Sequence, residues 1–365
     1  MKAAWLKDPA LVSERVGGLK VLERQLFLLR RAGFERAWVS APRPDEDLRL
    51  PEGLDVSWGA GPDGEPRLEV SGRHLVRLAA LKEAAAGGPA RWRDEAGETV
   101  LAVVGSGAAA ERPLPPGASV PLSAPLRGGP VDSWLMREAV KGTDGFMAKH
   151  FDRRISLAVT RLLLDTPVTP NQMTVASTAV GLAGAALLAA GAYGPGLAGA
   201  LLVWLHSTLD GCDGELARLR FQESPLGGVL DFWGDNLVHA ALFLCLGAGV
   251  ARAQGVLWPA GLGLLAAASA SASAALAYLH SKKKAAARKA AGPFFTGVAE
   301  VAPDAAAAER RVASLEDTLA QRDFVYLLVA LAAAGRLPWF LWASAVGSPL
   351  FLAALLWLRR RSLFV

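Results

Sequence analysis

The feature that most constrains this 365-residue chain is a series of long apolar segments in its second half. Hydrophobic residues make up 52% of the sequence, and the longest runs of Ala, Leu, Gly and Val all lie there. The first segment runs from Met173 to about residue 192 and is long enough to cross a bilayer as a helix. Five more follow, at about 195–214, 228–250, 255–280, 323–335 and 338–358. The sequence therefore predicts an all-α domain of six transmembrane helices.

The charged residues between these segments predict their orientation. Loops on one side carry Arg218, Arg220, Lys282, Lys283, Lys284, Arg288, Lys289, Arg310, Arg311, Arg322, Arg359, Arg360 and Arg361. Loops on the other side offer Arg252 and Arg336. Because basic residues accumulate on the cytoplasmic side, we expect both termini in the cytoplasm and the protein in the cell inner membrane. The first residues lack the continuous apolar core of a secretory signal, which agrees with a cytoplasmic N-terminal domain.

The first part of the chain has a different character and is predicted to be a small α/β domain over residues 1–104. Helical spacing of apolar residues, with Gly33 near its end, predicts a helix at 18–34. Short apolar runs predict strands at 35–42, 55–59, 67–72 and 98–105, and a second helix is expected at 74–88. Residues 105–130 are rich in Gly, Pro, Ser and Ala without an apolar period, which predicts a linker or a loosely packed connection between the domains.

The membrane domain is expected to span residues 131–365. Its first part, 133–166, places Lys and Arg on one side of a helix and Trp, Met, Phe, Ile and Leu on the other, as in helices that lie in the membrane interface. The alternative is an ordinary surface helix of the first domain. Thr169 and Pro170 then supply an N-cap and a first-turn proline for the first span.

Four aspartates at or inside the ends of two apolar segments predict a functional site. Asp210 and Asp213 are three residues apart and share a helix face, and Asp231 and Asp235 are four apart and share another. A carboxylate in such surroundings is costly without a metal or a cationic partner. Two facing helices with a carboxylate pair each can hold one or two hard divalent cations and leave positions open for phosphate oxygens and water.

Small residues and a cation surround these aspartates. Gly211, Gly214, Gly227, Gly228 and Ala217 leave room for close helix approach or for a bulky ligand. Arg218 offers a planar cation that suits phosphate. The residues by themselves predict Mg²⁺-assisted phosphoryl chemistry at a membrane face.

The spacing also resembles a known signature. Asp210-x-x-Asp213-Gly214-x-x-Ala217-Arg218, eight residues, Gly227, three residues, Asp231, three residues and Asp235 matches the motif of the CDP-alcohol phosphotransferases. The resemblance extends from about Lys141 to the C-terminus. It includes the sequences around Arg153-Arg154-Ile155-Ser156 and Thr169-Pro170-Asn171-Gln172-Met173-Thr174.

This resemblance implies specific roles. Asp210, Asp213 and Asp231 would be the principal ligands of two Mg²⁺ or Mn²⁺ ions, and Asp235 would lie near the second metal and act as general base on the acceptor hydroxyl. Gly214, Ala217, Arg218 and Gly227 would line the pocket for the CDP moiety. Attack on the β-phosphorus would release CMP and join the two alcohols through a phosphodiester. Members of this family are usually homodimers.

The N-terminal domain resembles the sugar-phosphate nucleotidyltransferase fold, through Gly17-Gly18-Leu19-Lys20-Val21-Leu22-Glu23-Arg24 and Arg31-Ala32-Gly33. It lacks a glycine-rich nucleotide loop before Gly17, and Arg73 stands where active members place a metal-binding aspartate. We therefore expect a degenerate, non-catalytic domain. The fusion order resembles that of bifunctional inositol-phosphate cytidylyltransferase/di-inositol-phosphate-phosphate synthases. The predicted donors are CDP-diacylglycerol or CDP-inositol, and inositol phosphate is one candidate acceptor.

Several residues carry more than one interpretation. Asn171 would hydrogen-bond the nucleotide or the metal ligands, or cap its helix. His206 and His239 lie one turn from Asp210 and Asp235, where buried histidines bonded to neighbours are common. The basic residues Arg153, Arg154 and Lys141 would bind a phosphorylated acceptor or anionic membrane lipids.

The two cysteines, Cys212 and Cys245, are expected to be packing residues. With a net charge of +5 and no recognisable motif, no nucleic-acid partner is expected. Two other functional classes remain open. A non-catalytic membrane scaffold, with an N-terminal domain that binds a partner or senses a nucleotide, is the first. A transporter that couples cations through buried carboxylates is the second.

Overall fold

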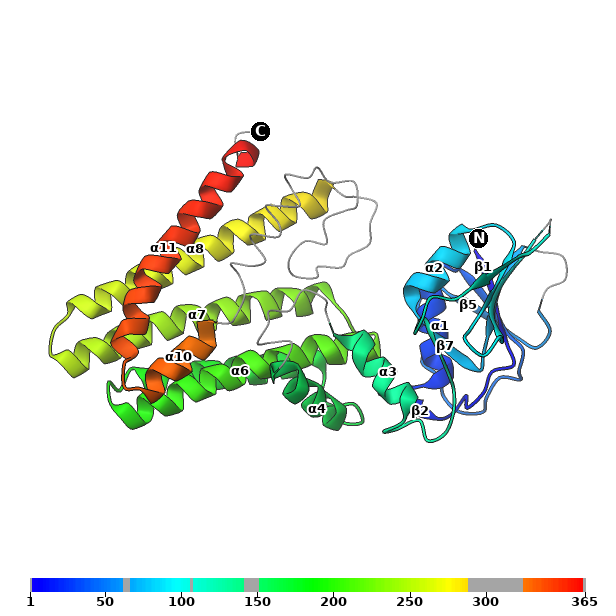
Figure 1. Cartoon of the computed structure of the whole chain (residues 1–365), viewed down its shortest axis with the longest axis horizontal. Helices are drawn as coiled ribbons and strands as arrows, with labels where there is room; N and C mark the ends of the chain where they lie inside the picture. The colour runs from blue at the N-terminus through cyan, green and yellow to red at the C-terminus, as the bar shows by residue number, and fades with distance from the viewer. Residues whose placement is uncertain (1, 62–65, 106–107, 141–150, 288–323, 364–365) are drawn as a thin grey trace. The chain divides into compact units, whose positions relative to one another are not determined.

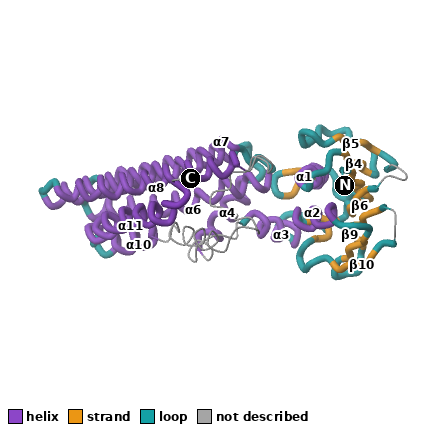
Figure 2. Tube along the Cα trace, turned by 90° about the horizontal axis from the view of Figure 1, so that it is seen from above, coloured by secondary structure: helices purple, strands orange, loops and turns teal. Residues whose placement is uncertain are grey.

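The computed structural model describes residues 2–61, 66–105, 108–140, 151–287 and 324–363. The chain divides into two compact units, one of Met1–Glu138 with Leu219–Phe221 and the other of Ala139–Arg218 with Gln222–Val365. Figure 2 shows that strands and short helices build the N-terminal unit and that long helices build the C-terminal unit. The predicted order, an α/β region followed by an all-helical region, is confirmed.

A seven-stranded mixed sheet forms the centre of the N-terminal unit, in the order β10-β8-β9-β6-β1-β4-β5. The strands are β1 (Ala3–Lys7), β4 (Arg36–Val39), β5 (Asp55–Trp58), β6 (Arg67–Ser71), β8 (Ala90–Arg93), β9 (Thr99–Val104) and β10 (Ala110–Pro113). Strand β1 runs parallel to β4 and β6, whereas β9 is antiparallel to β6 and β8. Two short antiparallel pairs accompany this sheet. They are β2 (Arg15–Val16) with β3 (Leu19–Lys20), and β7 (His74–Val76) with β11 (Ser119–Pro121).

The helices of this unit are α1 (Val21–Arg31), α2 (Leu78–Ala86) and α3 (Pro130–Ala139). Helix α1 forms where the sequence predicts it, because Leu22, Leu26 and Leu29 recur on one face and are fully buried. They pack with Leu6 of β1 and Leu101 of β9 in one hydrophobic core. The core is thus shared between the sheet and its helices.

Two expectations for this unit are corrected by the structure. Residues 105–130, expected to be a linker, contain β10, which pairs with β8, and β11, which pairs with β7. Strand β10 is exposed along its length, so its sequence shows no alternation of apolar and polar residues. Residues 74–88, expected to be one helix, begin with β7, and α2 starts only at Leu78.

The C-terminal unit is built from helices α4 (Arg153–Leu163), α5 (Pro170–Leu188), α6 (Tyr193–Arg220), α7 (Pro225–Gln254), α8 (Trp258–Ala287), α10 (Phe324–Ala333) and α11 (Leu337–Leu363). The last six coincide with the six predicted apolar segments (Figure 1). Within the described ranges, three stretches are long and apolar enough to cross a membrane: Pro225–Gln254, Trp258–Lys282 and Leu337–Trp357. The charges of Asp210, Asp213, Glu215 and Arg218 lower the hydropathy of α6.

The starts of α5 and α7 are fixed by local sequence. Thr169 caps α5, since its hydroxyl accepts from the Gln172 backbone N–H and the Gln172 side chain accepts from the Thr169 N–H, as the sequence predicts. Ser224 caps α7 in a similar way by accepting from the Gly227 N–H at 3.0 Å. Helix α7 has 30 residues, so it extends about 45 Å.

Close backbone approach holds these helices together. A Cβ atom built on Gly247 of α7 would lie 2.9 Å from the Cα of Gly263 on α8, so only glycine fits at this crossing. Large apolar side chains also cover the outer faces of the helices, and Leu264, Leu350 and Trp339 are each at least 60% exposed. Such a surface is unusual for a protein in water and typical of one in contact with lipid.

Candidate active site

Three of the four predicted aspartates meet between α6 and α7. Oxygens of Asp210, Asp213 and Asp231 all lie within 4.8 Å of one another. Asp210 and Asp213 are 5% and 7% exposed, and Asp231 is half-buried. The spacing along α6 directs the first two carboxylates to one face, and α7 brings the third to them. Carboxylates this close repel one another unless a cation lies among them.

Helix α5 supports this cluster. The Thr174 hydroxyl donates to Asp213 Oδ2, and the Gly214 backbone N–H donates to the other carboxylate oxygen. Thr174 was not among the predicted site residues, although it lies one turn after Asn171 on the same helix face. Because hydrogen bonds from neighbouring residues orient metal ligands, Thr174 joins the aspartates in the candidate site.

Asp235 lies one turn beyond Asp231 but contacts a histidine instead of joining the group of three. Its Oδ1 is 3.4 Å from Nε2 of His206, which is 2% exposed. The Nδ1 of His206 lies 2.9 Å from the Ser177 carbonyl oxygen. Since a carbonyl oxygen only accepts, Nδ1 carries a proton and Nε2 is directed at Asp235. His239 instead packs its ring edge-on against Phe324.

The predicted nucleotide-binding residues form two contacts. A Cβ built on Gly214 would lie 3.0 Å from a terminal nitrogen of Arg218, and one built on Gly227 would lie 3.0 Å from Asn171 Oδ1. The absence of side chains at these glycines thus lets Arg218 and Asn171 approach the backbone. Arg218 also donates from Nε to the Ala139 carbonyl at 2.7 Å, which leaves its terminal nitrogens directed elsewhere. Ala217 is half-buried on the same helix.

A buried glutamate next to the motif was not predicted. Glu215 is fully buried, and its carboxylate accepts from Arg153 at 2.6 Å, from the Ser156 hydroxyl at 2.7 Å and from the Thr160 hydroxyl at 2.6 Å. All three donors lie on one face of α4, so this cluster fastens α4 to α6. The structure therefore gives Arg153 a structural partner, whereas Arg154 is exposed.

The remaining predicted residues, a lysine and two cysteines, lie outside the aspartate cluster. Lys141, one of the basic residues expected to bind phosphate or lipid, lies outside the described residues. Cys212 is buried with its Sγ 3.4 Å from the Ser156 carbonyl oxygen, and Cys245 is half-buried, so both are free thiols in packing positions, as predicted.

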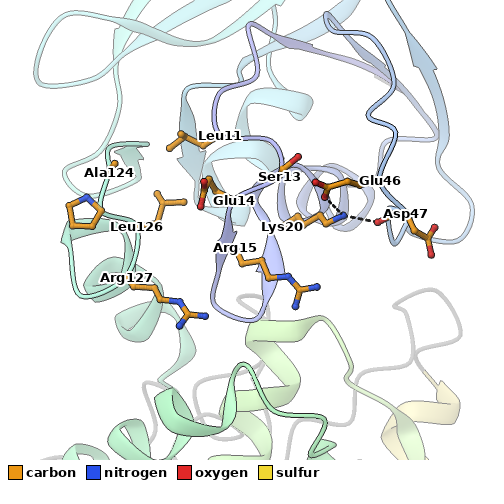
Figure 3. Close-up of a pocket in the computed structure, with 11 residues that line it drawn as sticks. Leu11, Ser13, Glu14, Arg15, Lys20, Glu46, Asp47, Ala124, Leu126 and Arg127 are labelled. Atoms are coloured by element: carbon orange, nitrogen blue, oxygen red, sulfur yellow. Dashed lines mark hydrogen bonds and ion pairs between the residues drawn. The ribbon is translucent and has the colours of Figure 1, made fainter.

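The N-terminal unit contains a pocket that none of the predicted site residues line. Figure 3 shows it between the 11–15 segment, the 46–47 segment and the 124–127 segment. Lys20 lies in it, but its Nζ is bound to Glu46 Oε2 at 2.7 Å and to the Asp47 carbonyl oxygen at 2.8 Å. The hydrogen bond from Lys20 holds the pKa of Glu46 below its usual range. The charge of Lys20 is therefore already compensated by Glu46, whereas a lysine that binds phosphate needs its ammonium group available to the ligand.

Comparison with known proteins identifies the helical region. The sequence model of the CDP-alcohol phosphatidyltransferase family matches residues 167–333, which include every aspartate of the cluster. This part of the chain is therefore similar to the CDP-alcohol phosphatidyltransferases. Three of the four motif aspartates, Asp210, Asp213 and Asp231, come together between α6 and α7 in the structure.

Several known proteins are similar to part of this chain. The chain is 42% identical over 131 residues to a bifunctional IPC transferase and DIPP synthase of Rubrobacter xylanophilus, covering 35% of this chain and 29% of that protein. A protein of the same name from Thermococcus kodakarensis is 47% identical over 113 residues, covering 31% and 25%. A phosphatidylinositol phosphate synthase of Mycobacterium tuberculosis is 34% identical over 98 residues, covering 27% and 44%.

The chain thus spans about a quarter to under half the length of these relatives. Among solved structures, the chain is similar to the phosphatidylinositol phosphate synthase of Mycobacterium tuberculosis with CDP-DAG bound. The match covers 55% of this chain and 91% of the synthase chain. It is 23% identical with a TM-score of 0.37, a similarity too weak to support any argument about this chain.

Proposed function

We propose that this protein is a membrane CDP-alcohol phosphotransferase. It would transfer the substituted phosphoryl group of a CDP-alcohol to an acceptor alcohol and release CMP. The observation that carries the proposal is the cluster of Asp210, Asp213 and Asp231 within the family's own domain. A scaffold or a transporter would have no need of the glycine and arginine contacts beside that cluster.

The donor set of the cluster fits a hard divalent cation, because all its side-chain ligands are carboxylates. We propose that Asp210, Asp213 and Asp231 hold Mg²⁺ or Mn²⁺, with Asp235 near a second ion. Such a cation neutralises the diphosphate and stabilises charge on the leaving group. Thr174 would keep Asp213 in the orientation that binding requires.

The CDP moiety would lie against Gly214, Ala217, Arg218, Gly227 and Asn171. The terminal nitrogens of Arg218 provide a planar donor for the diphosphate oxygens, and they are held beside Gly214. Asn171 would donate its amide N–H groups to the nucleotide from beside Gly227. The lack of side chains at the two glycines makes the space that these contacts need.

Asp235 would act as the general base. It takes the proton of the acceptor hydroxyl while the hydroxyl oxygen attacks the β-phosphorus, and the bond from that phosphorus to the bridging oxygen of CMP breaks. When both ring nitrogens of His206 carry a proton, Nε2–H donates to the Asp235 carboxylate and holds that side chain in place. His206 is itself held by its hydrogen bond to the Ser177 carbonyl oxygen. Ser177 of α5 thus orients His206 of α6, and His206 orients the Asp235 base on α7.

We further propose that all six helices α5, α6, α7, α8, α10 and α11 span the inner membrane, with the site and the N-terminal unit in the cytoplasm. The exposed apolar side chains of these helices support contact with lipid. Helix α4 would lie in the interface, since Ile155 and Leu162 are exposed beside Arg154 and Arg161. A homodimer is the proposed assembly.

The donor is proposed to be CDP-diacylglycerol or CDP-inositol, with inositol phosphate as a candidate acceptor. The names of the relatives support this range, since they include a DIPP synthase and a phosphatidylinositol phosphate synthase. The N-terminal unit, spanning about residues 1–104 and the strands that follow, is proposed to be a degenerate, non-catalytic nucleotidyltransferase-like domain. The ion pair that occupies Lys20 supports the loss of phosphate binding there.

The test is CMP release from membranes that contain the protein, with each radiolabelled donor, a panel of acceptor alcohols and added Mg²⁺. We expect release that requires the cation and is abolished by Asp213→Asn. Asp165→Asn, at an exposed carboxylate of the same unit, is the matched control and should leave the rate unchanged. If neither donor yields CMP, or if Asp235→Asn keeps full turnover, the proposed function is wrong.

A further inference from the structure

The N-terminal unit contains a second group of metal-ligating side chains, far in sequence from the aspartate cluster. His74 begins β7, and Asp94 and Glu98 flank the turn between β8 and β9. The Nε2 of His74 is 3.3 Å from Asp94 Oδ2 and 3.9 Å from Glu98 Oε2, and all three ligand atoms lie within 4.8 Å of one another. This geometry brings two carboxylates to one nitrogen.

His74 is buried, and its Nε2 atom lacks a hydrogen-bond partner among the described residues. His74 is 2% exposed, and its Nε2 makes no hydrogen bond within the described residues, although two carboxylates face it. Its Nδ1 is 3.0 Å from the Ser71 hydroxyl. When Nδ1–H donates to Ser71, the Nε2 lone pair is directed at the carboxylates. This is the arrangement of a metal-bound histidine, whose second nitrogen donates to an outer partner.

The turn holds one of the carboxylates in position. Asp94 Oδ1 accepts from the Ala96 and Glu98 backbone N–H groups at 3.0 and 2.8 Å. Gly97 completes the turn at a φ of +81°, which favours glycine. With Oδ1 engaged in the turn, Oδ2 is left facing His74. The side chain of Glu98 is 65% exposed and can adjust its position.

We propose that His74, Asp94 and Glu98 bind one divalent transition-metal cation, of which Zn²⁺ and Co²⁺ are the best candidates. Two ligands about 2.0–2.1 Å from a tetrahedral ion are about 3.3 Å apart, which agrees with the separation of His74 Nε2 and Asp94 Oδ2. A set of one imidazole and two carboxylates leaves the fourth position to water. The imidazole distinguishes this site from the all-carboxylate cluster on α6 and α7.

The ion would link β7, a strand of the small β7–β11 pair, to the turn between two strands of the large sheet. An ion that binds only the folded state would stabilise the N-terminal unit, by an amount that rises with the logarithm of the ion's concentration once this exceeds the Kd. The proposal does not depend on the proposed enzyme activity. The competing account is that His74 and Asp94 form a simple ion pair without a metal.

The test uses the full-length protein in detergent micelles and compares two glutamates of the same turn. Glu98→Gln removes a proposed ligand, and Glu95→Gln removes an exposed carboxylate outside the group. Equilibrium dialysis against Zn²⁺ with metal analysis should give one more bound equivalent in the wild type and in Glu95→Gln than in His74→Gln. Glu98→Gln should bind that ion about tenfold or more weakly.

Co²⁺ gives an independent measurement. A four-coordinate site with one imidazole should give a visible absorption that Glu95→Gln keeps and Glu98→Gln reduces. Because Glu98 is exposed, its substitution should leave the fold intact, so it carries the test even if His74→Gln does not fold. Equal Zn²⁺ affinity in wild type, Glu95→Gln and Glu98→Gln, or a Co²⁺ spectrum that all three share, would overturn the proposal in favour of the ion pair.

Discussion

Thr174→Val tests whether the aspartate cluster is a metal site that α5 holds in position. Valine keeps the β-branched shape but removes the hydroxyl that donates to Asp213 Oδ2. Thr174 is 3% exposed, so bulk water does not replace the lost donor. The carboxylate would then lose one of the two hydrogen bonds that orient it, the other coming from the Gly214 backbone.

The loss of this hydrogen bond sets the expected decrease in metal affinity. Removing an outer hydrogen bond to a metal ligand lowers metal affinity by about 10–100-fold. This range corresponds to about 1.4–2.7 kcal/mol, which agrees with the about 1.5–3 kcal/mol assigned to a hydrogen bond with a charged group. We therefore expect the Mg²⁺ concentration for half-maximal CMP release to rise by about 10–100-fold, with recovery of the rate at saturating Mg²⁺.

The assay is CMP release from a CDP-alcohol as a function of Mg²⁺ concentration. Thr178→Val is the matched control, since Thr178 lies one turn further along α5, beside Gly234. It should shift the Mg²⁺ requirement little. An unchanged requirement in Thr174→Val, or an equal shift in both variants, would refute the view that the Thr174 hydroxyl organises a metal ligand.

Substitutions at four further residues test the surroundings of the cluster. Arg153→Gln and Glu215→Gln should each cost about 3–5 kcal/mol of stability, and together less than the sum, in reversible unfolding in mixed micelles. Each change removes the ion pair that compensates the charge of the other residue. Gly227→Ala should raise KM for the CDP-alcohol about tenfold with little change in kcat, since its methyl group would lie 3.0 Å from Asn171 Oδ1. In steady-state assays, His206→Asn should lower kcat more than His206→Gln, because only glutamine keeps a donor near the position of Nε2.

Each of these three predictions would be contradicted by a specific result. Strictly additive losses at Arg153 and Glu215 would mean that the 2.6 Å contact carries no coupling. An unchanged KM in the Gly227 variant would separate that glycine from the donor pocket. Equal kcat losses in the two His206 variants would assign the histidine to packing alone and remove its role in positioning the base.

The helical region was largely predictable because its signals are local. Apolar runs, the Thr169 cap and the first-turn proline gave the positions of the helices within a few residues, except that α6, α8 and α11 extend further. The same holds for α1, whose leucines repeat with the helical period. The α/β unit was less predictable. Its short strands β7, β10 and β11 depend on pairing with distant strands, which leaves no periodic signal in three or four residues.

The sequence by itself determined that Asp210 and Asp213 lie on one helix face, because helical spacing places them together whatever the surroundings. Only the tertiary structure decided which side chains support them. Thr174 reaches Asp213, and His206 reaches Asp235, across helices that are separated by tens of residues in the chain. The physical reason is that the spacing of residues along one helix fixes its own faces, whereas the partner of each face depends on how helices pack.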